Sequence, residues 1–156
     1  MIHDNLGKKA EQKIKEWLDR PDLGYDFNRI PDQMTGLAGS RNICDFDLFI
    51  SPNRYYIESK ATWEDRFEFN RITEYQYQGL LRKSKISNVY GVVIVLFAAY
   101  RRAFIIDINE IDKLITSGKK SINIKKIGNW DIKYTEIQTV PSRKVLLDYT
   151  GNFQVD

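Results

Sequence analysis

The alternation of apolar and polar side chains along residues 44–61 is the clearest structural signal in this chain. Two such runs flank a Ser-Pro-Asn-Arg segment, which predicts a β-hairpin with a loop of about four residues. We expect Ile50 to pair with Tyr55 across the hairpin. Because successive side chains point to opposite faces of a strand, one face should be apolar. That face comprises Phe46, Leu48, Ile50, Tyr55, Ile57 and Ala61.

The other face of the predicted hairpin, which we expect to be the outer side of the sheet, carries three carboxylates and an amine. In the expected pairing Asp45 faces Lys60 and Asp47 faces Glu58. These residues could form ordinary cross-strand salt bridges, each worth roughly 0.2–1 kcal/mol on a solvated face. Two carboxylates directly opposite each other are unfavourable without a cation, however, so the set also predicts a metal site. Mg²⁺ binds carboxylate and phosphate oxygens, and a nearby lysine can orient water, which suits phosphodiester hydrolysis.

The remaining elements follow from other apolar periods. Helical spacing marks residues 5–19 and 72–86, and Thr73 with Gln76 fits a capping box at the start of the second helix. The whole pattern predicts an α/β domain with a mixed central sheet of about four or five strands, helices on both faces and the hairpin at one end. The other expected elements are a buried strand at 90–99, a strand at 103–108, a helix at 110–116 capped by Asn109, and small strands or turns at 122–127, 130–134 and 145–149.

Composition narrows the classes of protein. The chain has 156 residues, enough for one domain, and its net charge of +3 is compatible with a nucleic-acid partner. Cys44 and His3 are the only cysteine and histidine, which excludes an internal disulfide, a zinc site of Cys and His ligands, and Ser-His-Asp catalysis. No signal segment is evident, and the longest apolar run, 92–100, is too short to cross a bilayer. We therefore expect a cytoplasmic protein with no membrane partner.

The order of elements resembles the PD-(D/E)XK nuclease superfamily: a helix with a glutamate, a strand with an aspartate, a strand with Glu-x-Lys, and another helix. Over most of its length the chain looks like the RecU-type Holliday junction resolvases of Gram-positive bacteria and their phages. The spacing from Asp45 to Glu58 agrees with that family and favours Asp45 over Asp47 as the principal aspartate. The resemblance rests on Gly7 and Glu11 and on residues 29–45, 55–60, 75–76, 90–97 and 141–149.

The resemblance implies a restriction-endonuclease-like fold and a divalent cation, Mg²⁺ with Mn²⁺ as a plausible substitute. It implies that Asp45 and Glu58 bind the metal, with Glu11 or Asp47 as a further carboxylate, and that Lys60 positions the attacking water.

Two residues carry alternative roles. Glu11 is spaced for a salt bridge with Lys15 one helical turn away, as an alternative to the metal site. The resemblance places Gln76 near the active site among the catalytic residues, whereas the residues around it favour helix capping.

A loop from residue 28 to 42 is long for a compact domain, and loops of this length are usually functional or disordered. Arg29 and Arg41 in this loop, with Lys8 and Lys9 on the first helix, are predicted to contact DNA phosphates. In the resolvase family a longer stalk occupies this place and is implied to engage the junction centre. The chain carries only a short version of that stalk.

These observations lead to one expectation and two alternatives. We expect a Mg²⁺-dependent, structure-selective endodeoxyribonuclease that resolves four-way junctions in recombination and repair. Symmetric cutting of two strands implies a homodimer. The short loop keeps open a nuclease of the same fold that acts on branched or duplex DNA in repair or restriction. The other alternative is a non-catalytic DNA-binding protein, and the retained Asp, Glu and Lys set argues against it.

Overall fold

The computed structural model describes residues 5–31, 42–142 and 147–156. Its helices are α1 (Leu6–Leu18), α2 (Glu74–Lys83) and α3 (Ile108–Thr116). The strands of its main sheet are β1 (Asp26–Arg29), β2 (Phe46–Ile50), β3 (Asn53–Thr62), β5 (Val89–Phe97), β6 (Arg102–Asp107) and β8 (Thr135–Glu136).

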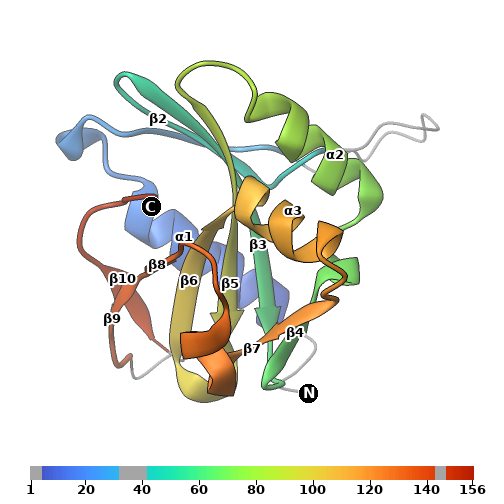
Figure 1. Ribbon diagram of the computed structural model, residues 1–156. Coiled ribbons are helices and arrows are strands. Elements are labelled where there is room, and N and C mark those ends of the chain that lie inside the picture. The colour runs from blue at the N-terminus through green and yellow to red at the C-terminus, as the bar shows by residue number, and fades with distance from the viewer. Residues whose placement is uncertain (1–4, 32–41, 143–146) are drawn as a thin grey trace, which may run out of the picture.

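The main sheet has the order β1-β2-β3-β5-β6-β8, in which only β3 and β5 run parallel. Helix α1 packs on one face, and α2 and α3 cover the other (Figure 1). The predicted mixed sheet flanked by helices is therefore confirmed, with six strands in the described residues where four or five were expected. None of the helices in these ranges has the length and apolar character that a membrane span requires.

Shorter elements extend the two ends of the sheet. Strand β4 (Arg66–Glu68) pairs with β7 (Ser121–Asn123), and β9 (Gln138–Val140) pairs with β10 (Asp148–Thr150). Four 3-10 helices complete the described chain: η2 (Pro21–Leu23), η3 (Phe69–Arg71), η4 (Ala98–Tyr100) and η5 (Ile124–Asn129).

Two hydrophobic cores hold the layers together. Helix α1 buries its apolar stripe, including Ile14 and Leu18, against the face of the sheet that carries Leu48 and Ile57. The second core lies between the opposite face and helices α2 and α3. Strand β5 is buried on both faces, as its continuous apolar run predicts, because alternate residues enter the two cores.

The hairpin of β2 and β3 differs from the prediction in its register. Leu48 pairs with Tyr55 and Ile50 with Asn53, which shifts the strands by two residues and leaves a two-residue connection, the commonest hairpin loop. A shift of two keeps every side chain on its predicted face, so the apolar face is confirmed. The predicted pairing of Asp47 with Glu58 is wrong, because Asp47 lies opposite Tyr56.

Several local predictions are also corrected. Residues 28 and 29, expected in a loop, belong to β1, a polar edge strand without the alternation that would reveal it. Helix α3 begins earlier than expected and is capped by Asp107, whose carboxylate accepts the Asn109 N–H at 2.8 Å. Residues 130–134, expected as a small strand or a turn, contain no strand. Strands β4, β8 and β9 were not predicted, because strands of two or three residues are too short for a periodic signal.

Candidate active site

Glu58 occupies the middle of β3 and is only 3% exposed. Strand β3 pairs Glu58 with Val93, which lies in the buried part of strand β5. The side chain of Glu58 shares the face that α2 and α3 cover. The sequence predicts this face to be the outer side of the sheet, and that prediction is wrong. The second core covers the face, so the carboxylate lies in a protein interior where charge is unfavourable.

The two oxygens of Glu58 have different surroundings. Oε2 accepts a hydrogen bond from Nε2 of Gln76 at 3.0 Å and forms an ion pair with Nζ of Lys60 at 3.1 Å. Oε1 is buried and has no hydrogen-bond partner among the residues that the structure describes. A buried polar atom without a partner is rare in a native structure and calls for an explanation, such as an ion that binds there.

The environment shifts the ionisation of Glu58 strongly. Burial raises its pKa most, the negative charge of Asp45 raises it further, and Lys60 lowers it in part, so that the pKa reaches about 8. Neither the amine nor the amide therefore fully compensates the buried negative charge.

Asp45 is fixed at the beginning of β2 by bonds from three directions. Its Oδ2 accepts the backbone N–H of Ser59 at 2.9 Å, its own N–H donates to the carbonyl of Ile57, and its carbonyl accepts the N–H of Ile30. These bonds hold the carboxylate beside Glu58, as the effect of Asp45 on the pKa of Glu58 requires. The register shift thus brings together Asp45 and Glu58, not Asp47 and Glu58.

Gln76 forms the predicted helix cap and also contacts Glu58. Its Oε1 accepts the backbone N–H of Thr73 at 3.1 Å, and its backbone N–H donates to Oγ1 of Thr73 at 3.2 Å, which completes the predicted capping box. Its Nε2 remains available and donates to Glu58. One side chain therefore caps α2 and contacts the site.

The other two predicted carboxylates pair with arginines. Oε1 of Glu11 lies 3.3 Å from a guanidinium nitrogen of Arg29. Arg29 is on β1 and pairs with Phe46, the residue that follows Asp45. Asp47 lies 3.4 Å from Arg54. Sequence reasoning missed Arg54, although a two-residue hairpin loop would have set it diagonally across from Asp47.

The predicted phosphate contacts lie outside this cluster. Lys8 and Lys9 are exposed on α1, Arg29 is 46% exposed, and Arg41 lies outside the described residues. Within the described ranges, no three acidic, cysteine or histidine side chains come together as a metal site. The carboxylates that the structure brings together are the pair Asp45 and Glu58, with Lys60 and Gln76 on the second of them.

Comparisons with known proteins identify the family of the chain and a fold that it shares. A family model described as RecU, recombination protein U, matches residues 34–154. Among similar solved structures is Hjc of Archaeoglobus fulgidus, a Holliday junction resolvase from an archaeal hyperthermophile. It superposes with a TM-score of 0.53 and 13% identity, covering 76% of this chain and 89% of the Hjc chain, a likeness that shows the fold. No curated protein sequence matches. Since the family model spans most of the chain, this protein belongs to the RecU family of Holliday junction resolvases.

Proposed function

We propose that this protein is a divalent-metal-dependent endodeoxyribonuclease that cuts four-way DNA junctions. The observation that carries the metal dependence is the buried, unpartnered Oε1 of Glu58 beside Asp45. Burial of a carboxylate oxygen without a partner is unfavourable, and a second carboxylate nearby makes ionisation harder still. A hard cation between the two residues would offset both effects.

The donor set fits Mg²⁺, which commonly binds proteins through one or two carboxylates and completes its shell with waters and phosphate oxygens. Mn²⁺ accepts the same oxygen ligands. Asp45 and Glu58 would hold the cation. When bound, the metal would polarise the scissile phosphate and neutralise charge on the leaving oxygen.

The neighbouring side chains have separate tasks in this proposal. Gln76 holds Oε2 of Glu58, which fixes the carboxylate rotamer and leaves Oε1 for the cation. Lys60, whose side chain is 16% exposed, lies between the buried carboxylate and solvent and would orient the attacking water. Glu11 and Asp47 each form an ion pair with an arginine. We assign them as further carboxylates at the edge of the metal site.

The substrate follows from the family and from the chemistry of resolution. The four-way junction is the substrate class of the family, and the A. fulgidus neighbour of the same fold is itself a Holliday junction resolvase. Resolution requires symmetric cuts in two strands, so the active form would be a two-fold symmetric homodimer that acts in recombination and repair. A second candidate is a nuclease for other branched or duplex DNA, favoured by the shortness of the 28–42 segment.

A cleavage assay on three labelled DNAs tests the proposal: a four-way junction, a Y-fork and a linear duplex, each with Mg²⁺ and with EDTA. We expect paired cuts in the junction with Mg²⁺ alone, little cutting of the duplex, and no cutting by Asp45→Asn. Equal cutting of all three substrates would support the second candidate. Cutting in EDTA would contradict the metal site.

A further inference from the structure

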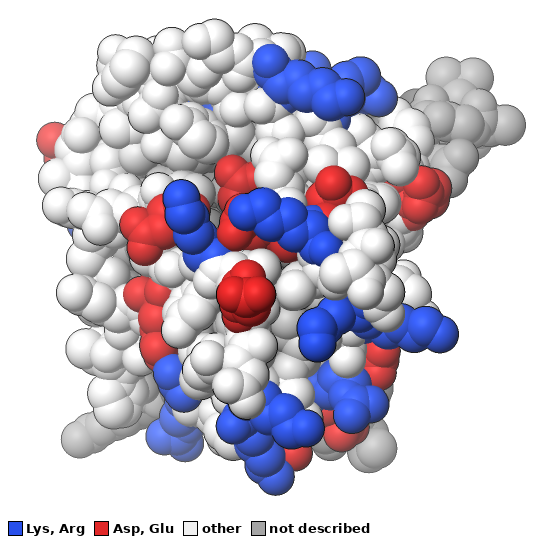
Figure 2. Space-filling view, viewed as in Figure 1, with Lys and Arg blue, Asp and Glu red and all other residues white. Residues whose placement is uncertain are grey.

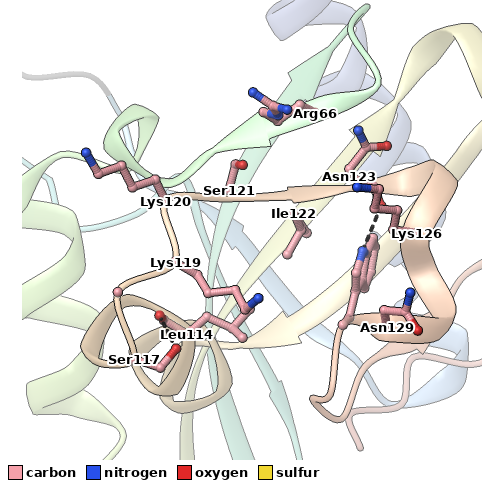
Figure 3. Close-up of a pocket in the computed structure, with 12 residues that line it drawn as sticks. Arg66, Leu114, Ser117, Lys119, Lys120, Ser121, Ile122, Asn123, Lys126 and Asn129 are labelled. Atoms are coloured by element: carbon pink, nitrogen blue, oxygen red, sulfur yellow. Dashed lines mark hydrogen bonds between the residues drawn. The ribbon is translucent and has the colours of Figure 1, made fainter.

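A basic pocket lies on the face of the sheet that α2 and α3 cover, away from the carboxylates. It forms where β4, β7, η5 and the C-terminal end of α3 meet, and its volume is ≈ 490 Å³ (Figure 3). Arg66, Lys119, Lys120 and Lys126 line it, with the buried Trp130. In Figure 3 the side chain of Lys119 extends into the pocket, whereas that of Lys120 points away from it.

The charge of this pocket is not compensated locally. Its described lining residues include no aspartate or glutamate. Arg66 forms only a long ion pair with Glu68 in the described residues, with 3.9 Å between the guanidinium nitrogen and the carboxylate oxygen. The nearby Asp65 forms an ion pair with Lys125, with 3.0 Å between Nζ and Oδ2. Asp65 therefore does not neutralise the charge that Lys126 brings to the pocket. Arg66, Lys119 and Lys126, with no acidic side chain in the lining, create a positive potential that favours a polyanion.

The end of α3 opposes this potential only weakly. A helix C-terminus carries partial negative charge because its last carbonyls lack partners. Here the N–H groups of Ser117, Gly118 and Lys119 donate to the carbonyls of Lys113, Ile115 and Leu114. Besides its cationic side chains, the lining carries serine hydroxyls and the side-chain amides of Asn123 and Asn129, which can donate or accept.

A second pocket connects the basic pocket to the first turn of α2, which carries Gln76. A neighbouring pocket of ≈ 420 Å³ shares Lys119 and Lys120 with it and extends to Glu74, two residues before Gln76. Arg66 follows Lys60 by six residues, so their Cα atoms are at most about 20 Å apart. Figure 2 shows Lys and Arg side chains gathered over the lower part of this face, where Figure 1 places β4, β7 and η5.

We propose that the basic pocket binds a backbone phosphate of one duplex arm of the DNA substrate. This inference rests on the proposed nuclease function and adds a second anchor beyond the scissile phosphate. Successive phosphates of one strand rise by about 3.4 Å along the helix axis, so an upper limit of about 20 Å between Lys60 and Arg66 corresponds to roughly six nucleotides or fewer. A phosphate held at this distance fixes the register of the arm without reading its sequence.

Paired charge-removal variants test the basic pocket. Lys119→Gln/Lys126→Gln removes two charges from it, and the control Lys15→Gln/Lys85→Gln removes two from exposed positions elsewhere. Junction binding is measured by gel shift in Ca²⁺ over a range of salt concentrations. Phosphate-ethylation interference is mapped on the same complexes.

The pocket variant should bind on the order of 10-fold more weakly than wild type, with a salt slope smaller by about one because one phosphate contact is lost. It should also lose interference at phosphates within roughly six nucleotides of the cut, while the control keeps them. Equal losses in both variants, or an unchanged interference pattern, would overturn this inference and leave the nuclease assignment intact. Absence of any DNA binding by the wild type would overturn both. Arg66→Gln provides an independent check through the same interference positions.

Discussion

The side chain of Gln76 joins the first turn of α2 to the buried carboxylate of Glu58, with 3.0 Å between Nε2 and Oε2. The same amide group caps the helix through its oxygen. The capping bond uses the amide oxygen, which leaves the amide nitrogen to donate to Glu58. The start of α2 therefore positions the candidate metal ligand through one side chain.

Two variants should separate helix capping by Gln76 from its contact with Glu58. Thr73→Ala removes the hydroxyl that accepts the Gln76 N–H and should lower the free energy of unfolding by about 1 kcal/mol. The contact between Gln76 and Glu58 is expected to persist, so cleavage should fall little. Gln76→Ala removes both functions and should lower stability and cleavage together. Chemical denaturation and single-turnover cleavage measure the two effects, and equal cleavage by both variants would argue against a positioning role.

Metal binding should be coupled to a proton at Glu58. The pKa of Glu58 is about 8 in the metal-free protein, and a cation binds its ionised form. Below pH 8, Mg²⁺ must therefore displace a proton, and its apparent affinity should rise about tenfold per pH unit. Calorimetry in two buffers of different ionisation enthalpy would count the released proton. Release of as many protons by Glu58→Gln as by wild type would assign the coupling to another group.

The metal-free protein should become less stable as the pH rises. The folded pKa of Glu58 lies above the ordinary value of 4.5, so its neutral form is favoured in the folded state. The contribution of Glu58 to stability is thus fully present below pH 4.5 and is lost as the pH rises toward 8. Each unit of pKa difference is worth about 1.4 kcal/mol. Melting curves in EDTA should show this slope in wild type and a flatter one in Glu58→Gln; parallel slopes would contradict it.

Asp45, just before β2, and Asp47, on β2, should contribute differently to the affinity for the metal. Asp45 lies beside Glu58, whereas Asp47 contacts Arg54 at 3.4 Å. Asp45→Asn should abolish Mg²⁺ binding measured by calorimetry, while Asp47→Asn should weaken it much less. A dominant effect of Asp47 would mean that the pair of ligands is assigned incorrectly.

Strict alternation made the hairpin predictable, and it also explains why an error in register did little harm. The faces of Asp45, Glu58 and Lys60 depend only on whether a position is odd or even, so a shift of two residues preserves them. Which carboxylates lie opposite each other depends on the loop length, and Ser51-Pro52-Asn53-Arg54 is compatible with a loop of two or four residues. The pattern of apolar and polar residues therefore could not predict which carboxylates lie opposite each other.

Burial of the site was not predictable from the hairpin alone. Polar residues on one face of a strand normally indicate solvent, but α2 and α3 cover this face through contacts distant in sequence. Gln76 shows the same limit: its capping motif is local and readable, whereas its bond to Glu58 spans 18 positions. The short edge strands β1 and β8 depend on neighbours in the sheet more than on their own residues.

The rate of junction cleavage by Lys60→Ala tests the central claim most directly. Nζ of Lys60 lies 3.1 Å from Oε2 of Glu58, and we assign Lys60 the role of orienting the attacking water. Its loss should therefore lower the single-turnover rate in Mg²⁺ by roughly 10²–10⁴-fold. Binding to the same four-way junction in Ca²⁺ should remain close to that of wild type. A near-normal rate, or a loss of binding as large as the loss of rate, would contradict the assignment of this cluster as the active site.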